Sequence, residues 1–150
     1  MVEYQRKDRY DINDLRDIMS ILRSPQGCPW DREQIHKSIR NDFIEEVYEA
    51  IEAIDLEDTE LLKEELGDVL LQIIFHCRIE EEKSCFDFDD ICDELCKKLI
   101  IRHPHVFGDI TVSDSGEVLK NWDSIKKETK GQTSYTETLT SLSLIHISEP

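Results

Sequence analysis

One long stretch, residues 60–83, constrains the fold of this chain more than any other segment. It contains no proline, and its middle, Val69–Cys77, is apolar nearly all the way round. Such a pattern is typical of a central helix that is buried on most sides. Asp58 or Thr59 can cap its start. Because the apolar run is too short to cross a bilayer, we expect no association with a membrane.

Four further segments repeat apolar residues at helical spacing, and none shows the alternation of a strand. The first begins at Asp11 or Asn13 and ends near Ser24–Gly27. A short turn of helix capped by Asp31 comes next. The other segments cover about residues 38–55, 87–103 and 115–129, with a loop at His103–Asp109. The segment 38–55 carries an apolar stripe of Ile44, Val47, Tyr48, Ile51 and Ile54. We therefore expect an all-α fold, a bundle of four to five helices whose exposed apolar faces pair it into a dimer.

The composition limits the classes of function. The chain has 150 residues, which suits one domain, and its net charge of −16 argues against a nucleic-acid binder. An odd number of cysteines, 5, without a signal peptide points to reduced thiols and a cytoplasmic location. A zinc site could be formed by Cys92, Cys96 and His103. It is a remote alternative, because structural zinc sites usually have closer paired spacings.

Acidic side chains cluster within two of the expected helices. Glu45, Glu46 and Glu49 lie in the first of them, and Glu65 and Asp68 lie in the next. Spacings of three and four residues place carboxylates on one helix face, where like charges repel. A divalent cation between them removes the repulsion, and Mg²⁺ prefers oxygen ligands together with phosphate. The pattern therefore predicts phosphate chemistry.

A row of small residues indicates how the two acidic helices meet. Glu46 is in line with Ala50 and Ala53, so a neighbouring helix can approach this row closely, whereas Glu52 lies towards solvent. Antiparallel packing across the short connection at residues 56–59 would bring both acidic pairs together. Gly67 costs about 1 kcal/mol against alanine in a helix, which suggests that a backbone or a ligand comes close there.

Basic and aromatic residues suitable for a nucleotide occur later in the chain. Lys98 and Arg102 are i, i+4 neighbours on one helix face, which is also the ordinary arrangement of a solvated helix C-terminus. Trp30 and Trp122 are expected to be core anchors rather than platforms for a base. The segment after Gly131 becomes rich in serine and threonine, and Leu142–Pro150 resembles a translated DNA-library adapter. We expect residues 131–150 to be a disordered tail with a non-native end, the alternative being a genuine disordered C-terminus.

Several short motifs accompany the acidic motif. Together they show that about residues 11–130 resemble the MazG family of all-α nucleoside triphosphate pyrophosphohydrolases. They are Gly27–Asp31, Gly67–Leu70, Phe86–Phe88, Arg102–Phe107 and Val118–Trp122. The match is to the N-terminal domain of the tandem bacterial members. It implies hydrolysis of a nucleoside triphosphate to a monophosphate and pyrophosphate, in nucleotide pool house-cleaning or regulation.

The resemblance also implies a role for each candidate residue. Glu46, Glu49, Glu65 and Asp68 would be ligands of Mg²⁺, with Mn²⁺ as a possible substitute. Lys98 and Arg102 would contact phosphates, Trp122 would flank the nucleotide, and Glu45 would hold or deprotonate the attacking water. Members of the family commonly form homodimers.

Two alternatives remain open from the sequence. Tandem members carry a second copy of the domain, which this chain lacks, so one alternative is a nucleotide-binding or dimerisation module with little activity of its own. The other is a di-iron bundle, which needs Glu-x-x-His on two helices, whereas this chain offers only Glu33-x-x-His36.

Overall fold

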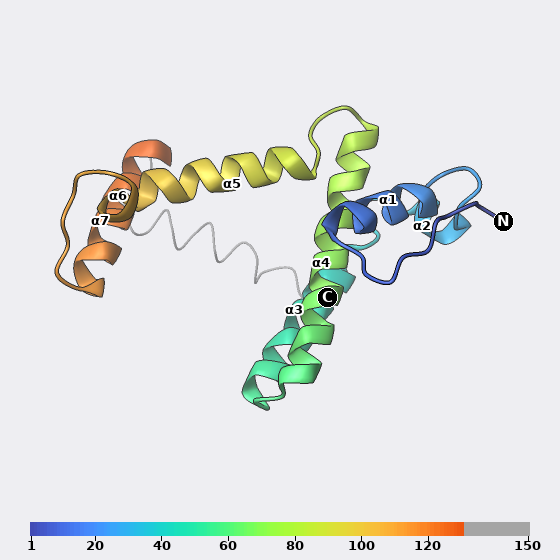
Figure 1. Cartoon of the computed structure of the whole chain (residues 1–150), viewed down its shortest axis with the longest axis horizontal. Coiled ribbons are helices and arrows are strands. Elements are labelled where there is room, and N and C mark those ends of the chain that lie inside the picture. Colours follow the sequence, from blue (N-terminus) through green and yellow to red (C-terminus); the bar gives the residue numbers. More distant parts are fainter. Residues whose placement is uncertain (131–150) are drawn as a thin grey trace. The chain divides into compact units, whose positions relative to one another are not determined.

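The computed structural model describes residues 1–130 of the chain, and these residues form helices joined by turns and loops, without a β-strand (Figure 1). The helices are α1 (Ile12–Leu22), α2 (Pro29–Glu33), α3 (Arg40–Asp55), α4 (Thr59–Glu82), α5 (Phe88–Arg102), α6 (Pro104–Phe107) and α7 (Ser115–Lys130). The prediction of an all-α fold is confirmed. No helix in the described part of the chain is long and apolar enough to cross a membrane. The predicted tail at residues 131–150 lies outside the described residues.

The chain divides into two units, residues 1–91 and the residues from Cys92 onward, and each is described by itself. The first unit holds α1 to α4 and the beginning of α5. The second holds the rest of α5 with α6 and α7.

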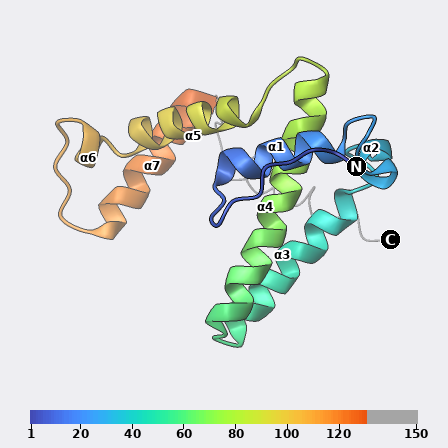
Figure 2. The ribbon, with the colours of Figure 1, turned by 45° about the vertical axis from the view of Figure 1, so that its right-hand side comes forward.

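An antiparallel hairpin of α3 and α4 forms the frame of the first unit, and Figures 1 and 2 show the two helices side by side. Glu57 turns the chain with a positive φ of 54°, and the Asp58 side chain accepts a hydrogen bond from the Leu61 amide at the start of α4. Ala50 and Ala53 are 6% and 0% exposed. The predicted row of small residues is therefore the buried face of α3.

The hydrophobic core lies where α1 crosses α4 (Figure 2). It consists of Met19, Ile39, Ile74, Phe75 and Ile79, with Leu15, Leu70 and Phe88 packed against it. At the start of α1, Asp11 and Asp14 form a reciprocal capping box, so the predicted cap at Asp11 is confirmed. The backbone of Gly27 packs against the end of α1. A Cβ at this position would lie 2.1 Å from the carbonyl oxygen of Ile21.

The apolar stripe of α3 is exposed in this chain rather than buried. Ile44, Tyr48 and Ile54 are 37%, 58% and 56% exposed. The reason is that α4 packs on the alanine row, which lies on another side of the helix. The prediction that Trp30 is a core anchor is wrong, because its side chain is 56% exposed and meets the edge of the Phe75 ring.

Three local predictions need correction. Cys28, not Asp31, occupies the N-cap of α2, because Pro29 begins the helix and places Asp31 in its first turn. The expected loop after His103 contains the short helix α6. Gly67 has no close neighbour, because a Cβ built there would meet nothing within 4 Å among the described residues.

Candidate active site

Three carboxylates from α3 and α4 converge in the first unit. One oxygen each of Glu46, Glu49 and Glu65 lies within 4.8 Å of the other two. Glu46 and Glu49 are one turn apart on α3, and Glu65 comes from the facing side of α4. The predicted meeting of the two acidic motifs therefore occurs, and the buried alanine row beside Glu46 allows it.

The cluster is electrostatically unbalanced. The Oε2 atoms of Glu46 and Glu65 are buried and have no hydrogen-bond partner. Burial, followed by the negative charge of Asp68 and then that of Glu49, raises the pKa of Glu46 above its ordinary value. Burial and then the charge of Glu49 likewise raise the pKa of Glu65. A buried oxygen that lacks a partner carries a free-energy penalty, so the arrangement favours a cation as its partner.

The donor set fits a hard divalent cation. All the converging atoms are carboxylate oxygens, which are the ligands that Mg²⁺ and Mn²⁺ prefer. A cation at this position would neutralise the like charges and give the orphaned oxygens a partner. We find no other group of three or more potential metal-ligating His, Cys, Asp or Glu side chains in residues 1–130.

The two remaining acidic candidates lie near the cluster but outside it. Asp68 is half-buried, and its charge acts on both Glu46 and Glu65, which places it beside the cluster. Glu45 precedes Glu46 on α3 and is exposed to solvent. Glu52, which was expected to be solvated, is exposed.

The basic candidates line a hollow in the second unit. Its volume is about 270 Å³, and its lining residues are Glu94, Lys97, Lys98, Ile101, Arg102, Thr129 and Lys130. Arg102 is only 8% exposed, so its guanidinium is largely shielded from water. Lys97 is paired with Asp93 at 2.6 Å. The expected neighbourhood of Lys98 and Arg102 is present, and α7 adds Lys130, which sequence spacing could not connect to them.

Trp122 does not line this hollow. Its ring lies 5.3 Å from the His103 ring, and Nδ1 of His103 donates a hydrogen bond to the Leu99 carbonyl at 2.6 Å. The acidic cluster belongs to the first unit, whereas Lys98, Arg102 and Trp122 belong to the second.

A polar network that sequence spacing did not indicate connects α4 to the loop before α3. His36 pairs its Nδ1 with Nδ1 of His76 at 2.7 Å and its Nε2 with Oε1 of Glu80 at 2.5 Å. The two imidazoles are 40 positions apart in sequence, so no local pattern joins them. His36, the histidine of the di-iron alternative, is thus engaged with α4.

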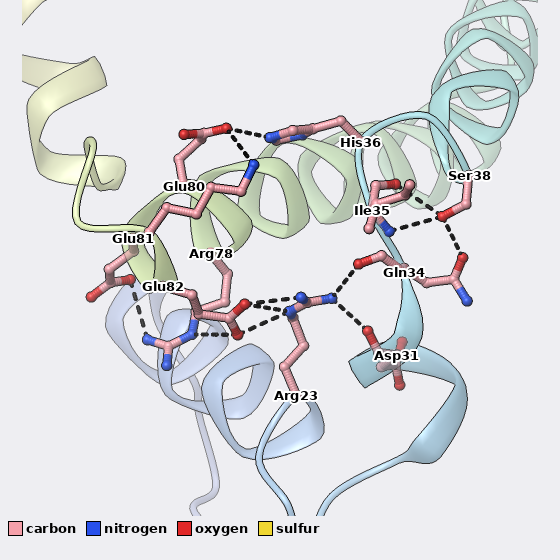
Figure 3. A network of polar contacts seen from close by, with 11 residues as sticks. Arg23, Asp31, Gln34, Ile35, His36, Ser38, Arg78, Glu80, Glu81 and Glu82 are labelled. Atoms are coloured by element: carbon pink, nitrogen blue, oxygen red, sulfur yellow. Dashed lines mark hydrogen bonds and ion pairs between the residues drawn. The ribbon is translucent and has the colours of Figure 1, made fainter.

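Arg23 holds the neighbouring part of the same loop, as Figure 3 shows. Its guanidinium donates hydrogen bonds to the Glu82 carboxylate and to the backbone carbonyls of Asp31 and Gln34. It also lies over the Phe75 ring, 5.4 Å from the centroid. The side chain is only 7% exposed, so these contacts are largely shielded from water. Arg23 and His36 together fix the segment that leads into α3.

Comparison with known proteins gives a consistent result. The model of the MazG nucleotide pyrophosphohydrolase domain matches residues 34–107, which contain all five acidic candidates. A nucleoside triphosphate pyrophosphohydrolase/pyrophosphatase MazG from Thermotoga maritima is 50% identical over 121 residues, covering 81% of this chain and 46% of that protein. A nucleoside triphosphate pyrophosphohydrolase from Escherichia coli K12 is 46% identical over 122 residues, with the same coverage of 81% and 46%.

Other relatives extend the match. The Bacillus subtilis protein YabN, described as uncharacterized, is 48% identical over 121 residues, which are 81% of this chain and 25% of YabN. The crystal structure of a mazG-related protein from Thermotoga maritima superposes with a TM-score of 0.64 at 25% identity, covering 77% of this chain and 99% of that one. The chain spans between a quarter and about half of the length of these curated relatives.

Proposed function

Because the chain belongs to the MazG family, we propose that it hydrolyses nucleoside triphosphates between the α- and β-phosphates, giving a nucleoside monophosphate and pyrophosphate. The observation that carries the proposal is the convergence of Glu46, Glu49 and Glu65, with buried oxygens that lack partners. Carboxylates so arranged suit a cation that binds phosphates.

Each candidate residue then has a chemical task. Glu46, Glu49 and Glu65, with Asp68 beside them, would hold Mg²⁺ or Mn²⁺. The metal would supply positive charge for the phosphate oxygens and lower the pKa of a bound water. Glu45, at the solvent edge of α3, would accept a proton from the attacking water.

The basic hollow supports binding of the leaving group. Lys98 and Arg102 would neutralise the charge that develops on pyrophosphate, and a shielded guanidinium such as that of Arg102 is suited to paired contacts with phosphate oxygens. Trp122 would lie against the nucleotide. A net charge of −16 makes such a local basic site distinctive, and it argues against nucleic acid as a partner.

The reaction is tested with the 150-residue chain, a panel of triphosphates and Mg²⁺ in ¹⁸O-labelled water. We expect equal amounts of monophosphate and pyrophosphate, with the label in the monophosphate, because water attacks the α-phosphorus. Diphosphate and inorganic phosphate as products would contradict the position of cleavage. Absence of any product from folded protein would favour the second candidate function, a nucleotide-binding or dimerisation module.

The exposed stripe of α3 supports a homodimer as part of the proposal. Ile44, Val47, Tyr48, Ile51 and Ile54 form an apolar face that α4 does not cover. A second copy of the chain in the cytoplasm would bury it. Light scattering after gel filtration should give twice the mass of one chain, and Ile51→Glu should halve it. A monomeric wild-type protein would overturn the dimer.

A further inference from the structure

A polar face of α4 continues from the acidic cluster towards the loop before α3. Asp68, Gln72 and His76 follow one another at intervals of four residues, so they share this face. The charge of Asp68 acts on Glu46 of α3, and the His76 ring lies 5.5 Å from the Phe43 ring of α3. Gln72 lies between these two contacts on the same face and therefore points towards α3.

Gln72 is buried without using its full hydrogen-bonding capacity. The residue is 7% exposed, and its Oε1 atom is buried and has no hydrogen-bond partner. Glu65 Oε2, which lies two turns before Gln72 on α4, and Glu46 Oε2 on α3 are also buried and without a partner. A buried amide oxygen that accepts no hydrogen bond lowers the stability of the fold. A donor from a bound molecule would remove this cost.

The hydrogen bonds around His36 determine which atom of His76 is available. The Glu80 carboxylate can only accept, so Nε2 of His36 carries a proton and donates it. In neutral His36 the other ring nitrogen, Nδ1, then accepts the proton of His76 Nδ1. His76 Nε2 is consequently left with a lone pair. The face thus offers two acceptors, Gln72 Oε1 and His76 Nε2.

We propose that Gln72 and His76 accept hydrogen bonds from the nucleoside of the substrate whose phosphates the acidic cluster binds. This proposal rests on the proposed function. The donors would be an exocyclic amino group of the base or a ribose hydroxyl. From Asp68 to His76 the helix rises by about 12 Å, which is enough for a nucleotide to extend from its α-phosphate to its base. The Phe43 ring beside His76 supplies an apolar surface on the α3 side.

The test compares Gln72→Met with wild type on matched substrates. ATP is paired with ITP and CTP with UTP, which differ in the exocyclic amino group, and each ribonucleotide is paired with its 2′-deoxy form. Loss of the acceptor should lower kcat/KM by about 10- to 100-fold for the partner that has the donor, and much less for the other. Methionine keeps the length of the side chain, and circular dichroism checks the helices.

Two further variants sharpen the comparison. His76→Phe keeps a ring against Phe43 but removes Nε2, so it should reduce the same preference. Gln5→Met changes an exposed glutamine and should leave every ratio unchanged. An equal fall in kcat/KM for all substrates, or no fall, would overturn the proposal. Either result would show that Gln72 does not distinguish between nucleosides.

The same contrast can be measured without turnover. Isothermal titration with AMP, IMP, CMP and UMP in Mg²⁺ gives the affinities of wild type and Gln72→Met. If wild type hydrolyses no triphosphate, the proposed function fails, yet a selective loss of affinity in Gln72→Met would still support the nucleoside contact. Equal affinities in both proteins would refute it.

Discussion

Nδ1 of His36 and Nδ1 of His76 lie 2.7 Å apart, close enough to share one proton. The rings are nearly coplanar, with an interplanar angle of 12°, as an in-plane N–H···N bond requires. If both nitrogens were protonated, two N–H groups would face each other. This pair therefore links the loop before α3 to α4 only while at least one imidazole is neutral.

The pair makes stability depend on pH. Burial, then the nearby His36, lowers the pKa of His76 below its ordinary 6.5, and the hydrogen bond from His36 lowers the pKa of Glu80. The unfolded chain therefore binds these protons first, so the free energy of unfolding should fall as pH decreases through about 6.5 and below. The contribution of His76 to this slope should stay below about 1.4 kcal/mol per pH unit, because one site can take up at most one proton. Urea unfolding at pH 7.5 and 5.5 measures it. In His76→Gln, a drop as steep as that of wild type would contradict this origin.

Removing one carboxylate of the site should abolish turnover while the helices remain. Glu49→Gln and Asp68→Asn each delete a charge that the proposed cation would need, so kcat should fall at least about 100-fold. Glu52→Gln is the matched control, since Glu52 is exposed on the same helix. Product formation by chromatography gives the rates, and circular dichroism monitors the fold. Rates like those of wild type in either site variant would show that the cation is held elsewhere.

Binding of Mg²⁺ should stabilise the wild-type chain but not a variant that lacks the Glu46 carboxylate. Mg²⁺ at 100 times its Kd should raise Tm by about 5–10 °C, because it binds the folded cluster alone. Glu46→Gln removes like-charge repulsion, so its Tm in EDTA should be equal to or higher than that of wild type, and Mg²⁺ should raise it much less. Differential scanning calorimetry with and without Mg²⁺ compares the two. An identical Mg²⁺ response in both proteins would exclude Glu46 as a ligand.

Arg23 should be among the most costly side chains to remove. Arg23→Ala removes the guanidinium that donates to the Asp31 and Gln34 carbonyls, and it leaves Glu82 with Arg78 as its ion-pair partner. We expect a loss of about 2–4 kcal/mol in the free energy of unfolding, reduced from the fully buried case because Glu82 is partly exposed. Arg9→Ala, at an exposed arginine, should cost little. Urea unfolding followed by circular dichroism measures both. A loss below 1 kcal/mol in Arg23→Ala would mean that the loop is held by other contacts.

The helices and the acidic cluster could be predicted because their signals are local. Asp11 and Asp58 cap helices where the sequence indicates, and Glu46 shares its row with alanines that proved to be buried. Charges three and four residues apart define a face on each helix, and a short connection makes the two helices antiparallel. No longer-range information is needed to bring Glu46, Glu49 and Glu65 together.

What could not be predicted depends on which face another segment covers. Trp30 was expected to be a core anchor, yet its side chain is 56% exposed and meets the edge of the Phe75 ring. His36 and His76 meet only because the loop after α2 folds back onto α4. Lys130 joins Lys98 and Arg102 because α7 returns to α5. Each of these contacts links residues that are far apart in sequence.

The two buried alanines of α3 have a consequence for ion selectivity. Ala50 and Ala53 are the side chains over which α3 and α4 approach each other, so their methyl groups set the separation of the helices. The distance between the carboxylates of Glu46 and Glu65 follows from that separation. Valine at position 50 or 53 would widen it without touching a ligand, and would shift the preferred ionic radius from Mg²⁺ towards Ca²⁺. In the proposed metal site, residues that never contact the ion would thus determine the size of the ion that fits.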